Sequence, residues 1–256
     1  MTEAVPDAGA AELRPAYYAQ PRFLRRRWVR DWWTLLHPPY TLWHLAYVVI
    51  GACLVGPVRV SRLLASVLAF FLAVGIAAHA LDELHGRPLR TSIPDWALVA
   101  SAAAGLGGAV AIGIVGAVQV GWLLAVFIVV GVALALSYNL ELFGARLHTN
   151  AMFAASWGTF PVLTGYAAQH DALSVPAVVA GVSAYFLASA QRRLSTPARR
   201  LRRRTSSVTG TVVATDGSVS DLTATALLDP LEGALAALSW AVVALAISLA
   251  LARLHP

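Results

Sequence analysis

The chain has 256 residues, of which 58% are hydrophobic and only 12% are charged, and its formal net charge is +6. A soluble domain carries about 25% charged residues, so this composition excludes an ordinary soluble globular protein and points to a membrane protein. The single cysteine, Cys53, excludes an internal disulfide and argues against a cysteine-based metal site.

Apolar runs long enough to cross a membrane recur along the whole chain. A run of about 18 apolar residues or more is typical of a membrane-spanning helix. The candidate spans are residues 40–56, 63–81, 96–117, 122–140, 151–168, 173–190 and 231–252. Pro161 is expected to kink the fifth of them. The predicted fold class is therefore all-α, a polytopic transmembrane helical bundle of about seven spans.

The distribution of arginine predicts the orientation of these spans. All 19 basic residues are arginine, and if the N-terminus is cytoplasmic, 16 of them lie on the inner side and only Arg59, Arg62 and Arg253 on the outer side. Because cytoplasmic loops are enriched in positive charge, we expect a cytoplasmic N-terminus in the plasma membrane of a prokaryote. Three polar segments between the spans then lie on the same cytoplasmic face.

The predicted organisation of the chain follows from the spans and the loops between them. A cytoplasmic Arg-rich segment is expected to precede a six-helix membrane core, which a cytoplasmic Arg/Ser/Thr-rich loop connects to a last transmembrane helix. In the same order, these four parts are residues 1–38, 39–194, 195–229 and 230–256.

The first polar segment is "HALDELHGRPLR", which begins at His79 near the end of the second span. Residues three and four apart share a helix face, so Asp82 and Glu83 can both converge with His79. Mg²⁺ favours one or two carboxylates completed by water and substrate phosphate, which Arg87 and Arg90 could also hold. Imidazole with carboxylate also suits Zn, Fe or Mn. The alternative is a solvated helix end whose charges pair locally.

The second polar segment, "SYNLELFGARLHTN", joins the fourth and fifth spans. Tyr138 and Asn139 end the fourth span, whereas Arg146 and His148 precede the fifth. In the functional interpretation these side chains line a cavity that faces the first segment. In the alternative, Tyr138 anchors the helix at the membrane interface and Arg146 only follows the positive-inside rule.

The third polar segment, residues 190–225, is rich in arginine, and seven arginines lie between Arg192 and Arg204. They could bind anionic lipid headgroups or a diphosphate, and we expect only Arg192 and Arg193 to face inward. Nucleic acid is not expected as a partner, because no aromatic residues are interleaved with the arginines. The stretch "VVATDGSVSD", residues 212–221, predicts a short β-hairpin within this loop.

Several stretches, in this order, resemble the UbiA superfamily of intramembrane prenyltransferases. "LLHPPYTLWHLAYVVIGACL" at 35–54 is similar to the first helix of that family, and "AHALDELHGRPLRT" takes the place of its first Asp-rich motif. "YNLELFGARLHTNAMFAASWGTFPVLTGY" at 138–166 is similar to the exit of its fourth helix and to its fifth helix. No spaced acidic pair follows the sixth span, where the family has its second Asp-rich motif.

The resemblance implies a divergent UbiA-type enzyme that acts on a prenyl diphosphate, either transferring the prenyl group to a small or lipid acceptor or cyclising it. In that family two acidic clusters hold Mg²⁺ on the diphosphate. Here Asp82 and Glu83 would bind the metal with His79, and His148 would act as the base. The diphosphate and the acceptor would be bound by Arg87, Arg90, Tyr138, Asn139, Arg146, Arg192 and Arg193.

Two other classes of function remain open at this stage. One is a non-catalytic UbiA-like protein that binds lipid or takes part in assembly. The other is a transporter, which has less support because the two halves show no repeat symmetry and no charge lies at mid-span depth.

Overall fold

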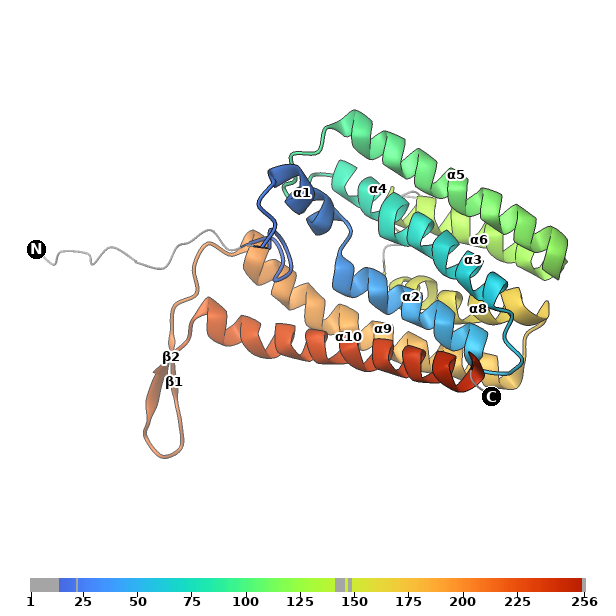
Figure 1. The fold of residues 1–256 in the computed structure, drawn as a ribbon. Helices are drawn as coiled ribbons and strands as arrows, with labels where there is room; N and C mark the ends of the chain where they lie inside the picture. Colours follow the sequence, from blue (N-terminus) through green and yellow to red (C-terminus); the bar gives the residue numbers. More distant parts are fainter. Residues whose placement is uncertain (1–13, 22, 141–145, 147–148, 255–256) are drawn as a thin grey trace, which may run out of the picture.

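The computed structural model describes residues 14–21, 23–140, 146 and 149–254. In this part of the chain helices dominate, which confirms the all-α class, and one two-stranded hairpin is the only sheet. The helices run side by side along a common direction (Figure 1). In chain order they are α1 (Arg27–Leu35), α2 (Pro38–Cys53), α3 (Val60–Phe70), η1 (Phe71–Ala78), α4 (His79–Leu84), α5 (Asp95–Val120), α6 (Trp122–Asn139), α7 (Asn150–Ala154), η2 (Ala155–Thr159), α8 (Phe160–His170), α9 (Val175–Arg204) and α10 (Ala224–Leu254).

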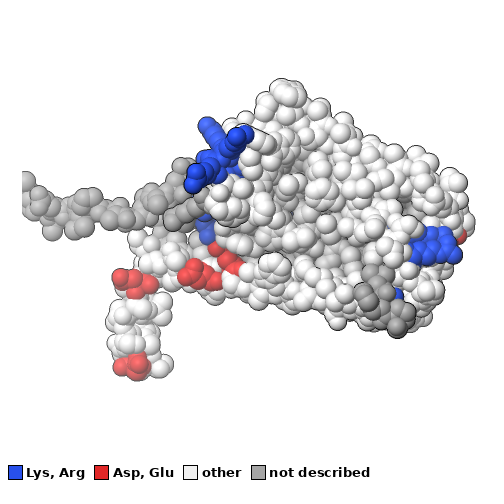
Figure 2. Space-filling model, in the orientation of Figure 1, with Lys and Arg blue, Asp and Glu red and all other residues white. Residues whose placement is uncertain are grey.

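Four continuous helical stretches are long and apolar enough to cross a membrane, which indicates a multi-pass membrane protein. They are Val60–Leu84, Asp95–Val120, Trp122–Asn139 and Ala224–Arg253. Charged residues gather at the two ends of the bundle and on the hairpin, and an uncharged band separates the ends on the visible face (Figure 2). Large apolar side chains such as Val118 and Val129 are exposed on the outside, as lipid contact requires.

The remaining predicted spans, the first, fifth and sixth, also fall on helices. The first coincides with α2, which has only 16 residues and buries the polar side chains of Thr41 and His44. The fifth coincides with α7, η2 and α8, which bury Ser156, Thr164 and Gln169. Polar groups are tolerated in α2 and α8 because these helices lie inside the bundle. The sixth predicted span falls on α9, which exposes apolar side chains such as Val179 and Phe186, as the four stretches named above do.

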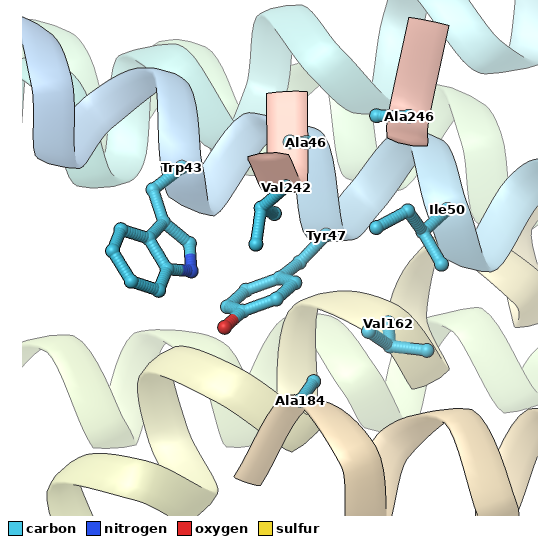
Figure 3. Close-up of a cluster of buried hydrophobic side chains, with 8 residues drawn as sticks. All are labelled: Trp43, Ala46, Tyr47, Ile50, Val162, Ala184, Val242 and Ala246. Atoms are coloured by element: carbon cyan, nitrogen blue, oxygen red, sulfur yellow. The ribbon is translucent and has the colours of Figure 1, made fainter. Parts of the chain in front are cut away.

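Helix α2 lies at the centre of the bundle, between a layer formed by α3, α5 and α6 and a layer formed by α9 and α10 (Figure 1). Its main apolar cluster combines side chains of α2 with those of three other helices (Figure 3). The cluster consists of Trp43, Ala46, Tyr47 and Ile50 of α2, Val162 of α8, Ala184 of α9, and Val242 and Ala246 of α10.

Two glycines allow a close crossing of α2 with α8. A Cβ atom on Gly51 would lie 1.9 Å from the carbonyl oxygen of Val162, and one on Gly165 would lie 2.2 Å from the carbonyl oxygen of Val48. Only hydrogen fits at either position, so each helix supplies a glycine where the backbone of the other approaches. Such contacts replace the hydrophobic driving force that membrane helices lack.

Two segments wind as π-helix within otherwise α-helical rods. η1 separates α3 from α4, and η2 lies between α7 and α8, directly ahead of Pro161. The expected irregularity at Pro161 is thus a wider turn, and the Thr159 hydroxyl in it donates to the carbonyl of Gly181 at 2.9 Å. π-helical turns are frequent at functional sites, and both of these segments border the cavities described below.

The predicted hairpin is confirmed. Strand β1 (Thr211–Val213) pairs antiparallel with β2 (Val219–Asp221), with Val212 opposite Ser220. Gly217 has a φ of +85°, and the Asp216 carboxylate accepts a hydrogen bond from the backbone N–H of Ser218 at 2.9 Å. The hairpin extends away from the helices at the end of the bundle where α9 ends and α10 begins (Figure 1).

Candidate functional site

A cavity of about 160 Å³ lies at the same end of the bundle, and we call it the polar cavity. Its walls come from helices distant in sequence and from residues 14–20, which we call the N-terminal strap. Histidine, tyrosine and arginine side chains are concentrated there. The polar residues that line it include Tyr17, Tyr18, His37, Tyr40, His44, His79, Asp82, Tyr138, Asn139, Gln191, Arg192, Ser195, Arg199, Arg202, Arg203 and Glu232.

Residues predicted from three separate polar segments meet in this cavity. They are His79 and Asp82 from α4, Tyr138 and Asn139 from the end of α6, and Arg192 from α9. The fold thus brings together the ends of helices that the sequence analysis expected on one membrane face. Arg87, Arg90, Arg146 and Arg193 are not among the lining residues, and His148 lies outside the described residues.

Glu83, expected to bind metal with His79 and Asp82, points elsewhere. Its fully buried carboxylate accepts hydrogen bonds of 2.9 Å from the backbone N–H groups of Leu89 and Thr91 and from the Thr91 hydroxyl. These donors satisfy a buried charge, which would otherwise be very costly. Within the described residues no group of three or more His, Cys, Asp or Glu side chains is placed to hold a metal ion. The expected three-residue metal group is therefore not formed.

Arg87 was expected to bind phosphate, but in the structure it stabilises the loop after α4. Its guanidinium donates to the carbonyl of Ile93 at 2.5 Å and forms an ion pair with Asp95 at the start of α5. Both Arg87 and Arg90 have a positive φ, of 53° and 54°, so the loop is tightly wound. Glu83 and Arg87 together stabilise this loop rather than the cavity.

Three arginines of the polar cavity were not predicted. The sequence predicts Arg199, Arg202 and Arg203 in the cytoplasmic loop 195–229, but α9 continues unbroken to Arg204. Helical periodicity then places Arg192, Arg199 and Arg203 on one face at intervals of seven and four residues. The sequence shows this spacing, but the predicted sixth span ends at residue 190, where the apolar run ends.

The Asp82 carboxylate faces these arginines. Burial lowers the pKa of the Arg192 guanidinium, and its neighbours Tyr138 and Asp82 act in the opposite direction. Burial also lowers the pKa of Arg203, again opposed by Asp82. Because arginine stays protonated even when its pKa is reduced, the cavity concentrates positive charge around Asp82, whereas Glu232, its other carboxylate, is paired with Arg202. Such a site attracts anions that carry several charges.

Three histidines line the cavity in a defined tautomer. The Nδ1 atoms of His37, His44 and His79 lie 2.8, 2.6 and 3.2 Å from the carbonyl oxygens of Leu35, Tyr40 and Gly75 respectively. A carbonyl only accepts, so each Nδ1 carries the hydrogen and each neutral ring keeps Nε2 as an acceptor. The rings of His37 and His79 are stacked with centroids 4.3 Å apart. Burial, and secondarily His79, lowers the pKa of His37 well below its ordinary value, so His37 is neutral.

A second, apolar cavity of about 460 Å³ lies among α3, η1, α5, α6 and α8. We call it the apolar cavity. It extends from Arg62 and Gln119 near the opposite end of the bundle to Val74 and Trp157. Val74 of η1 and Trp157 of η2 line both cavities, so the polar and apolar cavities share a wall made by the two π-helical segments.

Comparison of the chain with family profiles, with curated proteins and with solved structures finds no match.

Proposed function

We propose that the protein is a divergent UbiA-type membrane enzyme that acts on a prenyl diphosphate. The observation that carries this proposal is the shared wall between an arginine-lined polar cavity and an elongated apolar cavity. A ligand that fits both has a multiply charged anionic head and a hydrocarbon chain. A prenyl diphosphate has this chemistry.

The diphosphate would be held by Arg192, Arg199 and Arg203. Guanidinium groups bind phosphate oxygens with two parallel hydrogen bonds, and fixed cations stabilise the charge that develops on a departing diphosphate. Asp82, the carboxylate that lines the cavity among these arginines, would hold Mg²⁺, which in such sites is usually held by one or two carboxylates, substrate phosphate and water. A bound Mg²⁺ would supply further neutralisation of the leaving group.

The reaction would begin when the C–O bond to the diphosphate breaks and the diphosphate leaves with the electron pair. The Trp157 ring lies between the cavities, at centroid distances of 5.8 Å from Tyr138 and 5.9 Å from His44. Aromatic faces stabilise cations, so these rings suit an allylic cation. The acceptor would form the new bond with that carbon and lose a proton to a base. His44, which lines the polar cavity beside Trp157 and keeps Nε2 as an acceptor, would be that base among the described residues, and His148, the base expected from the sequence, lies outside them.

In this proposal about seven helices cross the plasma membrane of a prokaryote and the polar cavity opens on the cytoplasmic side. A UbiA-like protein that binds lipid without catalysis is the second candidate. It is favoured by the lack of a preformed three-residue metal group within the described part of the chain.

Purified protein supplied with farnesyl diphosphate, Mg²⁺ and a lipid extract as acceptor tests the proposal through the release of inorganic diphosphate. Asp82→Asn should abolish release, whereas the matched control Asp229→Asn, which changes an exposed carboxylate outside the cavity, should retain it. Binding of farnesyl diphosphate without release by the wild-type chain would favour the non-catalytic candidate. Full release by Asp82→Asn would remove the proposed site.

A further inference from the structure

The N-terminal strap forms one wall of the polar cavity. Pro15, Ala16, Tyr17 and Tyr18 line it, and Ala19 is completely buried. The strap precedes α1 and lies against the arginine-bearing end of α9, a helix that begins more than 150 residues later in the chain. It therefore covers the surface on which the proposed anionic head would bind.

One end of the strap is firmly attached to α1. The backbone N–H of Gln20 donates to the Thr34 hydroxyl at 3.0 Å, and the Trp33 indole donates to the carbonyl of Tyr18 at 3.2 Å. The Tyr18 ring also packs edge-on against Tyr40, with centroids 5.7 Å apart. These contacts involve aromatic packing as well as hydrogen bonds, and they fix residues 18–20.

At the other end of the strap, Arg14 and Pro15 accept hydrogen bonds from two arginines of α9. Arg202 donates to the carbonyl of Arg14 at 3.4 Å, and Arg203 donates to the carbonyl of Pro15 at 3.0 Å. Arg202 is also held by Glu232 through contacts of 2.5 and 2.6 Å, so its charge is already paired. Arg203, in contrast, faces the cavity with a neutral carbonyl as its acceptor.

We propose that the strap is a built-in gate whose main-chain carbonyls occupy the arginines until an anionic ligand displaces them. Charged oxygens form shorter and stronger hydrogen bonds with guanidinium than neutral carbonyls do, so a diphosphate competes successfully for Arg203. The strap then opens at Arg14 and Pro15, while residues 18–20 stay attached to α1. This inference rests on the proposed function, because it needs an anionic ligand in the polar cavity.

Hydrogen–deuterium exchange of the full chain in lipid nanodiscs, with and without inorganic diphosphate, tests the gate. Exchange in the peptide that covers the strap should rise when diphosphate binds, while exchange in α1 stays unchanged. Arg203→Gln should raise strap exchange without ligand, whereas Arg204→Gln, which alters the exposed neighbour, should not. Unchanged or reduced strap exchange in the presence of bound diphosphate would show that the strap is a fixed wall and overturn the gate.

A chain that lacks residues 1–17 separates the gate from the proposed function. If the strap competes with the ligand, this chain should bind inorganic diphosphate several-fold more tightly than the intact protein. Weaker binding by the shortened chain would overturn the gate but leave the proposed function standing. Absence of diphosphate binding by both chains would contradict both the proposed function and the gate. In that case, strap exchange of Arg203→Gln without ligand would still show whether Arg203 holds the strap.

Discussion

Asp82 and Glu83 are adjacent acids at the end of the first long apolar stretch, yet they face different surroundings. Asp82 faces the cavity arginines, and Glu83 is enclosed by the backbone of the following loop. Neighbouring residues on a helix point about 100° apart, so one helix end can serve a ligand with one residue and the fold with the next. The two carboxylates therefore have separable effects on function and on stability.

Glu83→Gln is expected to destabilise the protein by about 2–4 kcal/mol, because an amide nitrogen replaces one acceptor and leaves a buried donor unpaired. Asp82→Asn is the matched control and should change stability by less than about 1 kcal/mol. Thermal unfolding in detergent compares the two variants. If Glu83→Gln were as stable as the wild type but inactive, Glu83 would act in the site after all.

His37 is expected to make the protein less stable in acid. Its pKa is lowered in the folded state, whereas in the unfolded chain it stays near the ordinary value of 6.5. The unfolded state therefore takes up the proton first, and stability is complete above the unfolded pKa and falls as the pH drops below it. The melting temperature should fall between about pH 7.5 and about pH 5, and His37→Gln should reduce the fall. An equal fall in wild type and variant would contradict a neutral, buried His37.

At the scale of helices, the crossing of α2 and α8 is sensitive to added volume. Gly51→Ala would place a methyl group against the Val162 carbonyl and should destabilise the bundle by about 2–3 kcal/mol. Gly107→Ala on α5 is the matched control, because a Cβ atom there meets nothing within 4 Å. Chemical unfolding of both variants in detergent provides the comparison. Equal stability of the two would show that α2 and α8 are not packed as described.

Most of the helical elements could be predicted from sequence, because apolar runs and turn residues are local signals. Helix α9 continues past residue 190, where the predicted sixth span ends, because the arginine-rich residues that follow lack the apolar run by which a span is recognised. This continuation contains Pro197. In the structure the hydroxyls of Ser195 and Thr196 donate to the carbonyl of Arg192, which supports the helix next to the proline. The hairpin was predictable because "TDGS" is a turn sequence between two short β-prone runs.

The site was only partly predictable. Asp82, Tyr138 and Arg192 were predicted because each is a polar residue at the end of a membrane helix, where polar residues are candidates for a functional site. His37, His44 and the N-terminal strap were missed because their place in the cavity depends on how distant helices pack. No local pattern shows that residues 14–20 contact Arg202 and Arg203.

At the scale of the whole molecule, the arginine distribution predicts the topology. In a chain with Cys53→Ala, the exposed variant Thr215→Cys in the hairpin turn should react with an impermeant maleimide only after the membrane is opened. The exposed variant Ala172→Cys, at the opposite end of the bundle, should react in intact cells. The reverse labelling pattern would show that the predicted orientation in the membrane is wrong.

The central claim is that the two cavities together bind one ligand with an anionic head and a prenyl chain. Isothermal titration of the protein in nanodiscs with geranyl diphosphate and with inorganic diphosphate tests it most directly. We predict that geranyl diphosphate binds at least about tenfold more tightly, and that Arg199→Gln weakens its binding by about tenfold or more while the exposed control Arg193→Gln does not. Equal affinity for the two ligands, or equal affinity of the two variants for geranyl diphosphate, would contradict the claim.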